Sequence, residues 1–90
     1  MASLDIEYIS TVNAKAEAGS PDEQYRAGLV FALGGDGVPV DLVTAHKWLN
    51  LAAMNGVVEA RDTRAEISQD MSSDEISKAQ KLAREWYLTH

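Results

Sequence analysis

The chain has 90 residues, of which 46% are hydrophobic and 24% are charged, and it contains no cysteine. This length supports one small hydrophobic core, and the composition is that of a globular domain rather than of a disordered or membrane-spanning chain. The lack of cysteine excludes disulfides, a thiol nucleophile and thiolate zinc sites, and a net charge of −6 gives no electrostatic reason to bind nucleic acid or anionic lipid. These properties leave another protein as the expected kind of partner.

The start of the chain lacks the features of a targeting segment. Residues 1–20 contain no basic stretch and no apolar run of roughly 7 to 15 residues, so we expect no secretory signal. No part of the chain approaches the roughly 20 apolar residues that cross a bilayer, because charges and glycines interrupt every hydrophobic segment. These patterns predict a cytoplasmic protein without a membrane anchor.

The first predicted helix covers residues 3–18. Its apolar residues recur on one face at the spacing of an α-helix: Leu4, Tyr8, Ile9, Val12 and Ala16. Gly19 follows, and glycine readily takes the left-handed conformation that ends many helices. The segment therefore predicts an amphipathic helix with a sharp end.

The second predicted helix covers residues 21–33. Ser20, Pro21 and Glu23 form a start signal in which the serine caps the helix, proline occupies the first turn and the glutamate caps in return. Because residues 27–33 have no polar face, we expect neighbouring elements to cover this helix on more than one side. It is the expected centre of the fold.

The third and fourth helices follow a break rich in glycine at residues 34–40. Asp41 is placed to cap the third helix, over residues 42–55. Its apolar residues recur at steps of three and four: Leu42, Ala45, Trp48, Leu49, Ala52 and Ala53. A fourth helix with fewer apolar positions is predicted over residues 57–68.

The fifth predicted helix covers residues 73–88, after a reciprocal capping pair formed by Ser72 and Glu75. Its apolar stripe repeats that of the third helix at a shift of 34 positions: Ala45 with Ala79, Trp48 with Leu82, Leu49 with Ala83 and Ala52 with Trp86. A helix–turn–helix period of this size is typical of α-solenoids. The sequence therefore predicts an all-α fold of about five helices in antiparallel pairs.

The middle of the chain also resembles a known family, the Sel-1-like repeats, which are relatives of tetratricopeptide repeats with a longer loop between the helices. The resemblance is carried by Tyr25, Gly28, Phe31, Gly35, Gly37, Val38, Pro39, Asp41, Ala45, Trp48, Leu49, Ala52, Ala53, Gly56 and Ala60. It implies a single domain over residues 1–90, with one complete repeat at about 21–56, partial units on both sides and a short right-handed α-α superhelix. In such a fold, small residues let the helices approach closely and Trp48 fills the space between layers.

The resemblance implies a non-catalytic adaptor or scaffold in a bacterial-type cytoplasm, binding a peptide or helix of a partner protein in a groove between helices. Residues on the side of the second helix that faces away from the core are the first expected contacts: Tyr25, Arg26 and Val30. The chain departs from the family pattern in three ways: the glycine loop is one residue longer than usual, Ala27 replaces a bulkier residue, and the cysteines found in secreted members are absent.

Catalytic and ligand-binding readings of the sequence are weaker. The glycines of residues 34–37 favour a turn over a phosphate-binding loop, because Asp36 would repel phosphate and no predicted strand precedes them. His46 is expected to be an ordinary surface histidine, and neither it nor His90 has the neighbours of a metal site. We therefore expect no catalytic residue, cofactor or metal; the alternative is a small helical enzyme or ligand-binding domain with a pocket near His46.

Two surfaces near the C-terminus are candidates for association. Trp86, Tyr87 and Leu88 are adjacent, so they cannot all face one core from a helix, and we expect them either to bind a partner or a second copy, as in a homodimer, or to fold back. Basic residues of the last two helices are predicted to point outward, as a solvated face or a docking strip for an acidic partner: Arg61, Arg64, Lys78, Lys81 and Arg84.

Overall fold

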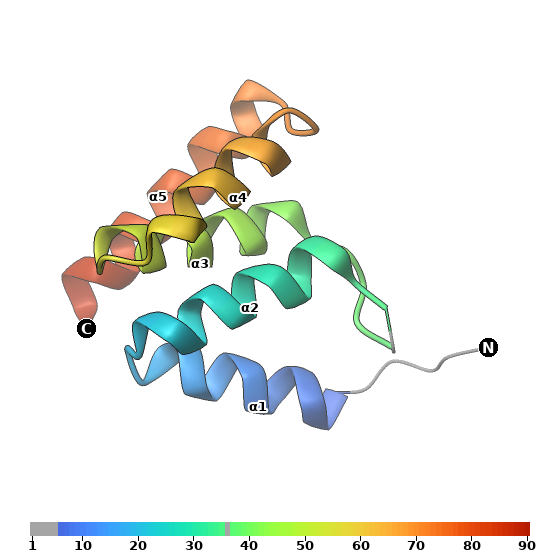
Figure 1. Cartoon of the computed structure of the whole chain (residues 1–90), viewed down its shortest axis with the longest axis vertical. Coiled ribbons are helices and arrows are strands. Elements are labelled where there is room, and N and C mark those ends of the chain that lie inside the picture. The colour runs from blue at the N-terminus through green and yellow to red at the C-terminus, as the bar shows by residue number, and fades with distance from the viewer. Residues whose placement is uncertain (1–5, 36) are drawn as a thin grey trace.

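The computed structural model describes residues 6–35 and 37–90, and within them the chain forms five α-helices (Figure 1). They are α1 (Ile6–Glu17), α2 (Pro21–Leu33), α3 (Leu42–Met54), α4 (Val58–Ser68) and α5 (Ser73–Thr89). The prediction of an all-α fold with five helices is confirmed, and each boundary within the described residues lies within one residue of the predicted one. The predicted start of the first helix, at residue 3, lies outside the described residues.

The helix starts follow from their capping residues. Asp41 accepts a hydrogen bond from the backbone N–H of Thr44 at 3.1 Å, and Ser72 and Glu75 cap each other as predicted. Ser20 also accepts from the backbone N–H of Glu23, at 3.5 Å. The predicted return bond from the Glu23 side chain is replaced by an ion pair with Arg26 at 3.6 Å, because the guanidinium one turn along α2 offers the carboxylate an opposite charge.

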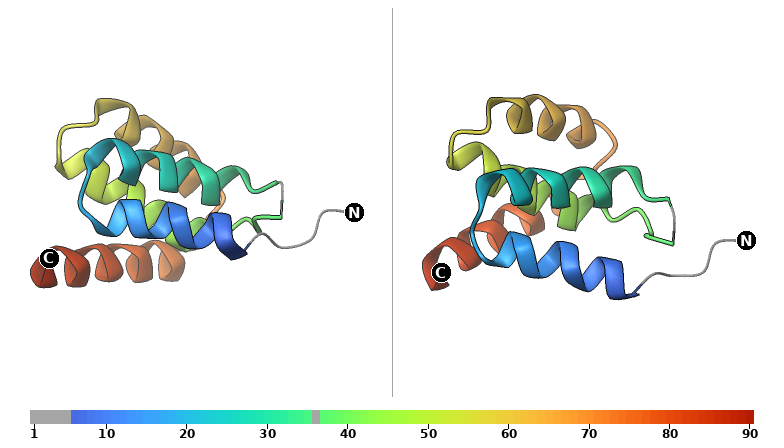
Figure 2. Two further views of the ribbon diagram at one scale, coloured as in Figure 1. Left: turned by 90° about the horizontal axis from the view of Figure 1, so that it is seen from below. Right: turned by 60° about the horizontal axis from the view of Figure 1, so that its bottom comes forward.

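Helix α3, rather than α2, is the centre of the molecule. It packs against α2, α4 and α5, whereas α1 packs mainly on α2. Figure 2 shows α4 and α5 on opposite sides of α3. The buried residues of α3 accordingly cover most of its circumference: Ala45, His46, Trp48, Leu49, Leu51 and Ala52.

Two apolar clusters form the core, and α3 contributes residues to both. The larger contains Trp48 and Leu51 of α3, and its other buried members are Val12, Ala16, Ala27, Phe31, Val38, Ala45 and Ala83. The smaller contains Leu49, Ala52 and Ala60, with Tyr25 of α2 packed against it. Ile67 of α4 packs against both clusters and so connects them.

The closest approach of α2 and α3 depends on Gly28. A Cβ atom at this position would lie 2.6 Å from Cδ2 of Leu49 and 3.3 Å from the carbonyl oxygen of Ala45. Ala45, Ala52 and Ala60 are also fully buried. The predicted role of these small residues in close helix packing is therefore confirmed.

None of the helices in the part of the chain that the structure describes is both long enough and apolar enough to span a bilayer.

Candidate interaction site

An apolar stripe runs along the outer side of α2. Tyr25, Leu29 and Leu33 follow one another at intervals of four residues, which places them on one face of the helix. Tyr25 and Leu29 are half-buried, whereas Leu33 is 77% exposed. Since folding leaves most of this large apolar side chain in water, the stripe is a candidate contact surface.

Two hollows lie end to end on this stripe, and we call them together the α2 groove. The first, of about 210 Å³, is lined by Tyr8, Arg26, Leu29, Val30, Leu33, Gly34, Gly35 and Val38. The second is lined by Asp22, Tyr25, Arg26 and Leu29. Because both contain Arg26 and Leu29, they form one continuous surface along about three turns of α2.

Tertiary structure completes the first hollow from two other segments. α1 packs against α2, and Tyr8 in the first turn of α1 lines the hollow together with Leu33 in the last turn of α2. After α2, Gly34 adopts a φ of 66° and Gly35 a φ of 90°, conformations that favour glycine. This turn brings Val38 back into the hollow, and the backbone N–H of Asp41 then donates to the carbonyl of Phe31 at 2.9 Å.

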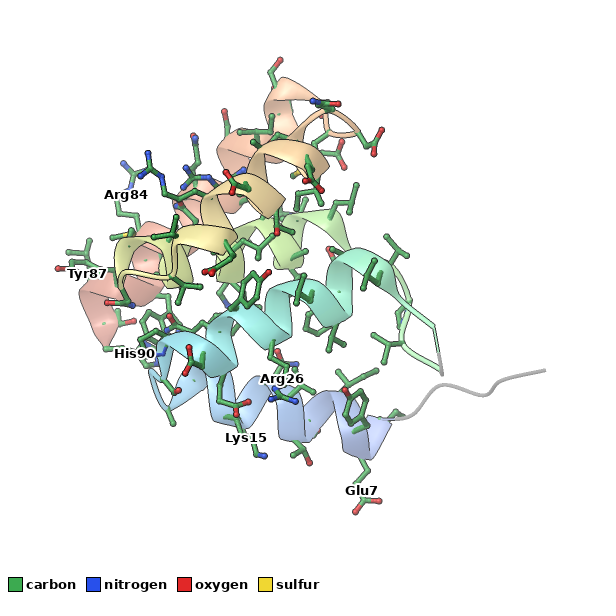
Figure 3. All side chains as sticks on the ribbon, in the orientation of Figure 1. Glu7, Lys15, Arg26, Arg84, Tyr87 and His90 are labelled. Carbon is green, nitrogen blue, oxygen red and sulfur yellow. The ribbon has the colours of Figure 1, made fainter. Side chains whose placement is uncertain are left out.

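The charges of the α2 groove lie on Arg26 and Asp22. Arg26 lies midway along α2 (Figure 3), is exposed, and has Glu23 as its ion-pair partner at 3.6 Å. An exposed pair at this distance is weak, so the guanidinium is available to a carboxylate of a ligand. Chemically, the groove offers apolar hollows for one or two large side chains and a cation between them.

The sequence-predicted contacts Tyr25, Arg26 and Val30 all line the α2 groove. Sequence reasoning missed Leu29 and Leu33, although their spacing from Tyr25 was a readable signal. It also missed Tyr8 and Val38, which only the packing of α1 and the glycine turn bring to α2.

The three large residues at the end of α5 do not form one surface. Trp86 turns inward: its ring meets that of Trp48 edge to face at a centroid distance of 5.9 Å, and its indole N–H donates to Glu17 at 2.8 Å. Tyr87 and Leu88 remain 57% and 74% exposed, and Tyr87 lies at the end of the molecule where α5 finishes (Figure 3). Trp86 is thus folded back, whereas Tyr87 and Leu88 stay exposed.

The prediction that His46 is a surface histidine is wrong. Its side chain is buried, with 3% of its surface exposed, because α4 packs over the side of α3 that the apolar pattern left polar. Burial, together with the positive charge of Arg64, lowers the pKa of His46 below its ordinary value. Its Nδ1 has no hydrogen-bond partner among the described residues, and His46 does not line the α2 groove.

The prediction that Arg64 points outward is also wrong. The side chain is half-buried and donates to the Oδ1 atom of Asn50 at 2.5 Å, so it bridges α4 and α3. The other residues of the predicted basic strip are exposed: Arg61, Lys78, Lys81 and Arg84. Within residues 6–35 and 37–90, no group of three or more His, Asp and Glu side chains is placed to hold a metal ion.

No protein-family model matches the chain, and none of the curated proteins is significantly similar to it. The resemblance to Sel-1-like repeats therefore rests on the residues that carry it.

Proposed function

We propose that the chain is a non-catalytic protein-interaction module of the Sel-1-like repeat type, an adaptor or scaffold that binds a helix or peptide of a partner protein in the α2 groove. The observation that carries the proposal is the α2 groove itself, an apolar surface with exposed Leu33 at one end and a cation in the middle. Within this proposal the protein works in the cytoplasm, where a domain without cysteine needs no disulfide.

The shape of the groove supports a specific ligand class. Tyr25 and Leu33 are eight positions apart, or about 12 Å along the helix axis, which matches two turns of a bound helix. An amphipathic helix presents apolar anchors at such intervals. A carboxylate one turn from an anchor would lie opposite Arg26, and that arrangement would fix the direction of the ligand.

A site-specific photocrosslink tests this proposal. With p-benzoyl-phenylalanine in place of Leu33, we expect a defined partner to be captured in cells, and Arg26→Glu should reduce its capture by about tenfold because the carboxylate would then face a like charge. The partner segment is then made as a peptide, and its binding to wild-type protein and to the Arg26→Glu variant is measured by calorimetry.

The matched control places the same photoreactive residue at Val58, an exposed apolar position on α4. Capture of the same partner with equal yield from Val58, or calorimetric binding that ignores the charge at Arg26, would reject the α2 groove as the binding surface.

A further inference from the structure

At the end of α5, the imidazole of His90 lies flat on the indole of Trp86. The ring centroids are 4.3 Å apart and the ring planes differ by 10°. The Nε2 atom of His90 lies 3.0 Å from Oε2 of Glu17, and its Nδ1 atom lies 3.0 Å from the carbonyl oxygen of Trp86. His90 therefore occupies a position where the Trp86 ring lies beneath its imidazole and the Glu17 carboxylate lies at the edge of the imidazole.

The hydrogen bonds of His90 define what this place recognises. The Nε2 atom lies within reach of the Glu17 carboxylate, and the Nδ1 atom also lies 3.1 Å from the hydroxyl oxygen of Thr89. The imidazole is thus a planar ring that stacks on the indole and meets the carboxylate at its edge. The guanidinium of arginine fits the same position: it is planar, stacks on aromatic rings and donates in its plane to carboxylates.

The Trp86 ring and the Glu17 carboxylate are held in position by groups other than His90. The indole N–H of Trp86 donates to the same Glu17 oxygen at 2.8 Å, and the Trp86 ring rests against buried Trp48. Lys47 also interacts with Glu17, but its ammonium group lies over the Trp48 ring, 4.0 Å from the centroid. Lys47 therefore does not occupy the Trp86 face that His90 covers.

The surroundings leave room for a peptide. An open groove of about 590 Å³ surrounds the pair and is lined by Glu17, Ala18, Gly19, Asn55, Trp86, Tyr87 and His90. Tyr87 is exposed at its rim. The net charge of −6 attracts cationic peptides to the molecule as a whole.

We propose that Trp86 and Glu17 form a binding site for an arginine side chain of a partner peptide, and that His90 occupies this site in the free protein. The arginine replaces the imidazole on the Trp86 ring and donates to Glu17, while an apolar residue beside the arginine contacts Tyr87. This site is separate from the α2 groove and shares no lining residue with it.

A titration with short peptides tests the site. The probe is acetyl-Leu-Arg-Leu-amide, its uncharged counterpart contains citrulline in place of arginine, and binding is followed by NMR at the indole N–H of Trp86. The indole N–H of Trp48, which is buried and has no hydrogen-bond partner among the described residues, reports in the same spectra whether the fold is intact. We expect the arginine peptide to move the Trp86 signal in a saturable way and the citrulline peptide to bind about threefold to tenfold more weakly.

Three variants separate this site from general attraction of charge. Glu17→Gln should weaken binding of the arginine peptide by about threefold to tenfold. Glu7→Gln removes the same charge at the opposite end of α1 (Figure 3) and should leave this binding unchanged. His90→Ala should strengthen binding by about threefold, since the internal occupant is gone. Equal binding of the citrulline peptide, an equal loss in Glu7→Gln, or weaker binding in His90→Ala would each overturn the proposal.

Discussion

Helices α3 and α5 carry the same apolar pattern 34 positions apart, yet they differ in how much of each is covered. Ala45 and its counterpart Ala79 are both fully buried, so the pattern sets the same inward face in the two helices. In all, α3 buries six residues and α5 only two. The difference follows from their neighbours, because α3 packs against three helices and α5 packs mainly against α3.

The polar positions of the two helices show what this difference does. His46 is buried, whereas its counterpart in α5, Gln80, is exposed. Lys47 is half-buried with its ammonium group over Trp48, whereas its counterpart Lys81 is exposed. A residue can thus be forced into the interior by the number of helices around it, even when the local pattern predicts a surface position.

The largest expected effect comes from shortening one leucine in each helix. Leu51→Ala removes a fully buried side chain of α3 and should lower the free energy of unfolding by about 2–5 kcal/mol, whereas Leu82→Ala in half-buried surroundings on α5 should cost roughly half as much. Urea unfolding followed by circular dichroism measures both losses. Equal losses would contradict the unequal covering of the two helices.

A smaller effect is expected where α2 meets α3. Gly28→Ala should destabilise the fold by about 1–3 kcal/mol, because the new methyl group would overlap Leu49, and the roughly 1 kcal/mol gain in helix propensity does not offset this. The α5 counterpart of Leu49 is Ala83, so this tight contact belongs to α3 alone.

A double-mutant cycle checks the cause of this loss. In the Leu49→Ala background, Gly28→Ala should cost at least about 1 kcal/mol less than in the wild type. Additive losses would show that Leu49 is not what Gly28 makes room for.

The smallest expected effect is on the pH dependence of stability, to which buried His46 of α3 should contribute and a histidine introduced at an exposed position of α5 should not. The pKa of His46 is lowered in the folded state below its ordinary value of about 6.5, so the unfolded chain binds more protons and stability falls as the pH drops through that value. The loss is complete below the folded-state pKa. His46→Leu should therefore lose less stability than the wild type between about pH 7.5 and 5.5.

The control for this prediction is Gln80→His, which places a histidine at the exposed counterpart in α5 and should leave the pH dependence of unfolding unchanged. The stability of the wild type and of both variants is measured as the denaturant midpoint of unfolding at each of the two pH values. If the stability of His46→Leu changed with pH as steeply as that of the wild type, the pH dependence would not come from the buried His46.

Local signals predicted the helices because helix ends depend on residues close in sequence. Ser20, Asp41 and Ser72 each cap the helix that the sequence assigned to them. The burial of His46 and the inward bond of Arg64 were not predictable in this way, because both depend on how α4 packs over α3.

The same distinction applies to the candidate site. Tyr25, Arg26 and Val30 could be nominated from α2 alone, since they belong to one helix, although Tyr25 and Val30 also pack against the core clusters. Tyr8 and Val38 come from α1 and the glycine turn, and nothing local in the sequence relates them to α2. Trp86, Tyr87 and Leu88 were correctly recognised as unable to share one core, but which of them turns inward depends on Trp48 and Glu17.

The central place of α3 also bears on how the chain reaches this structure. The main helix contacts join α1 to α2, α2 to α3, α3 to α4 and α3 to α5, so every partner is the next helix or the one after it along the chain. Such short sequence separations keep the entropy of loop closure small, and helical proteins of this kind fold in about microseconds to milliseconds. Most helix contacts therefore form between segments near one another in sequence, whereas the bond between Glu17 and Trp86 joins segments 69 positions apart.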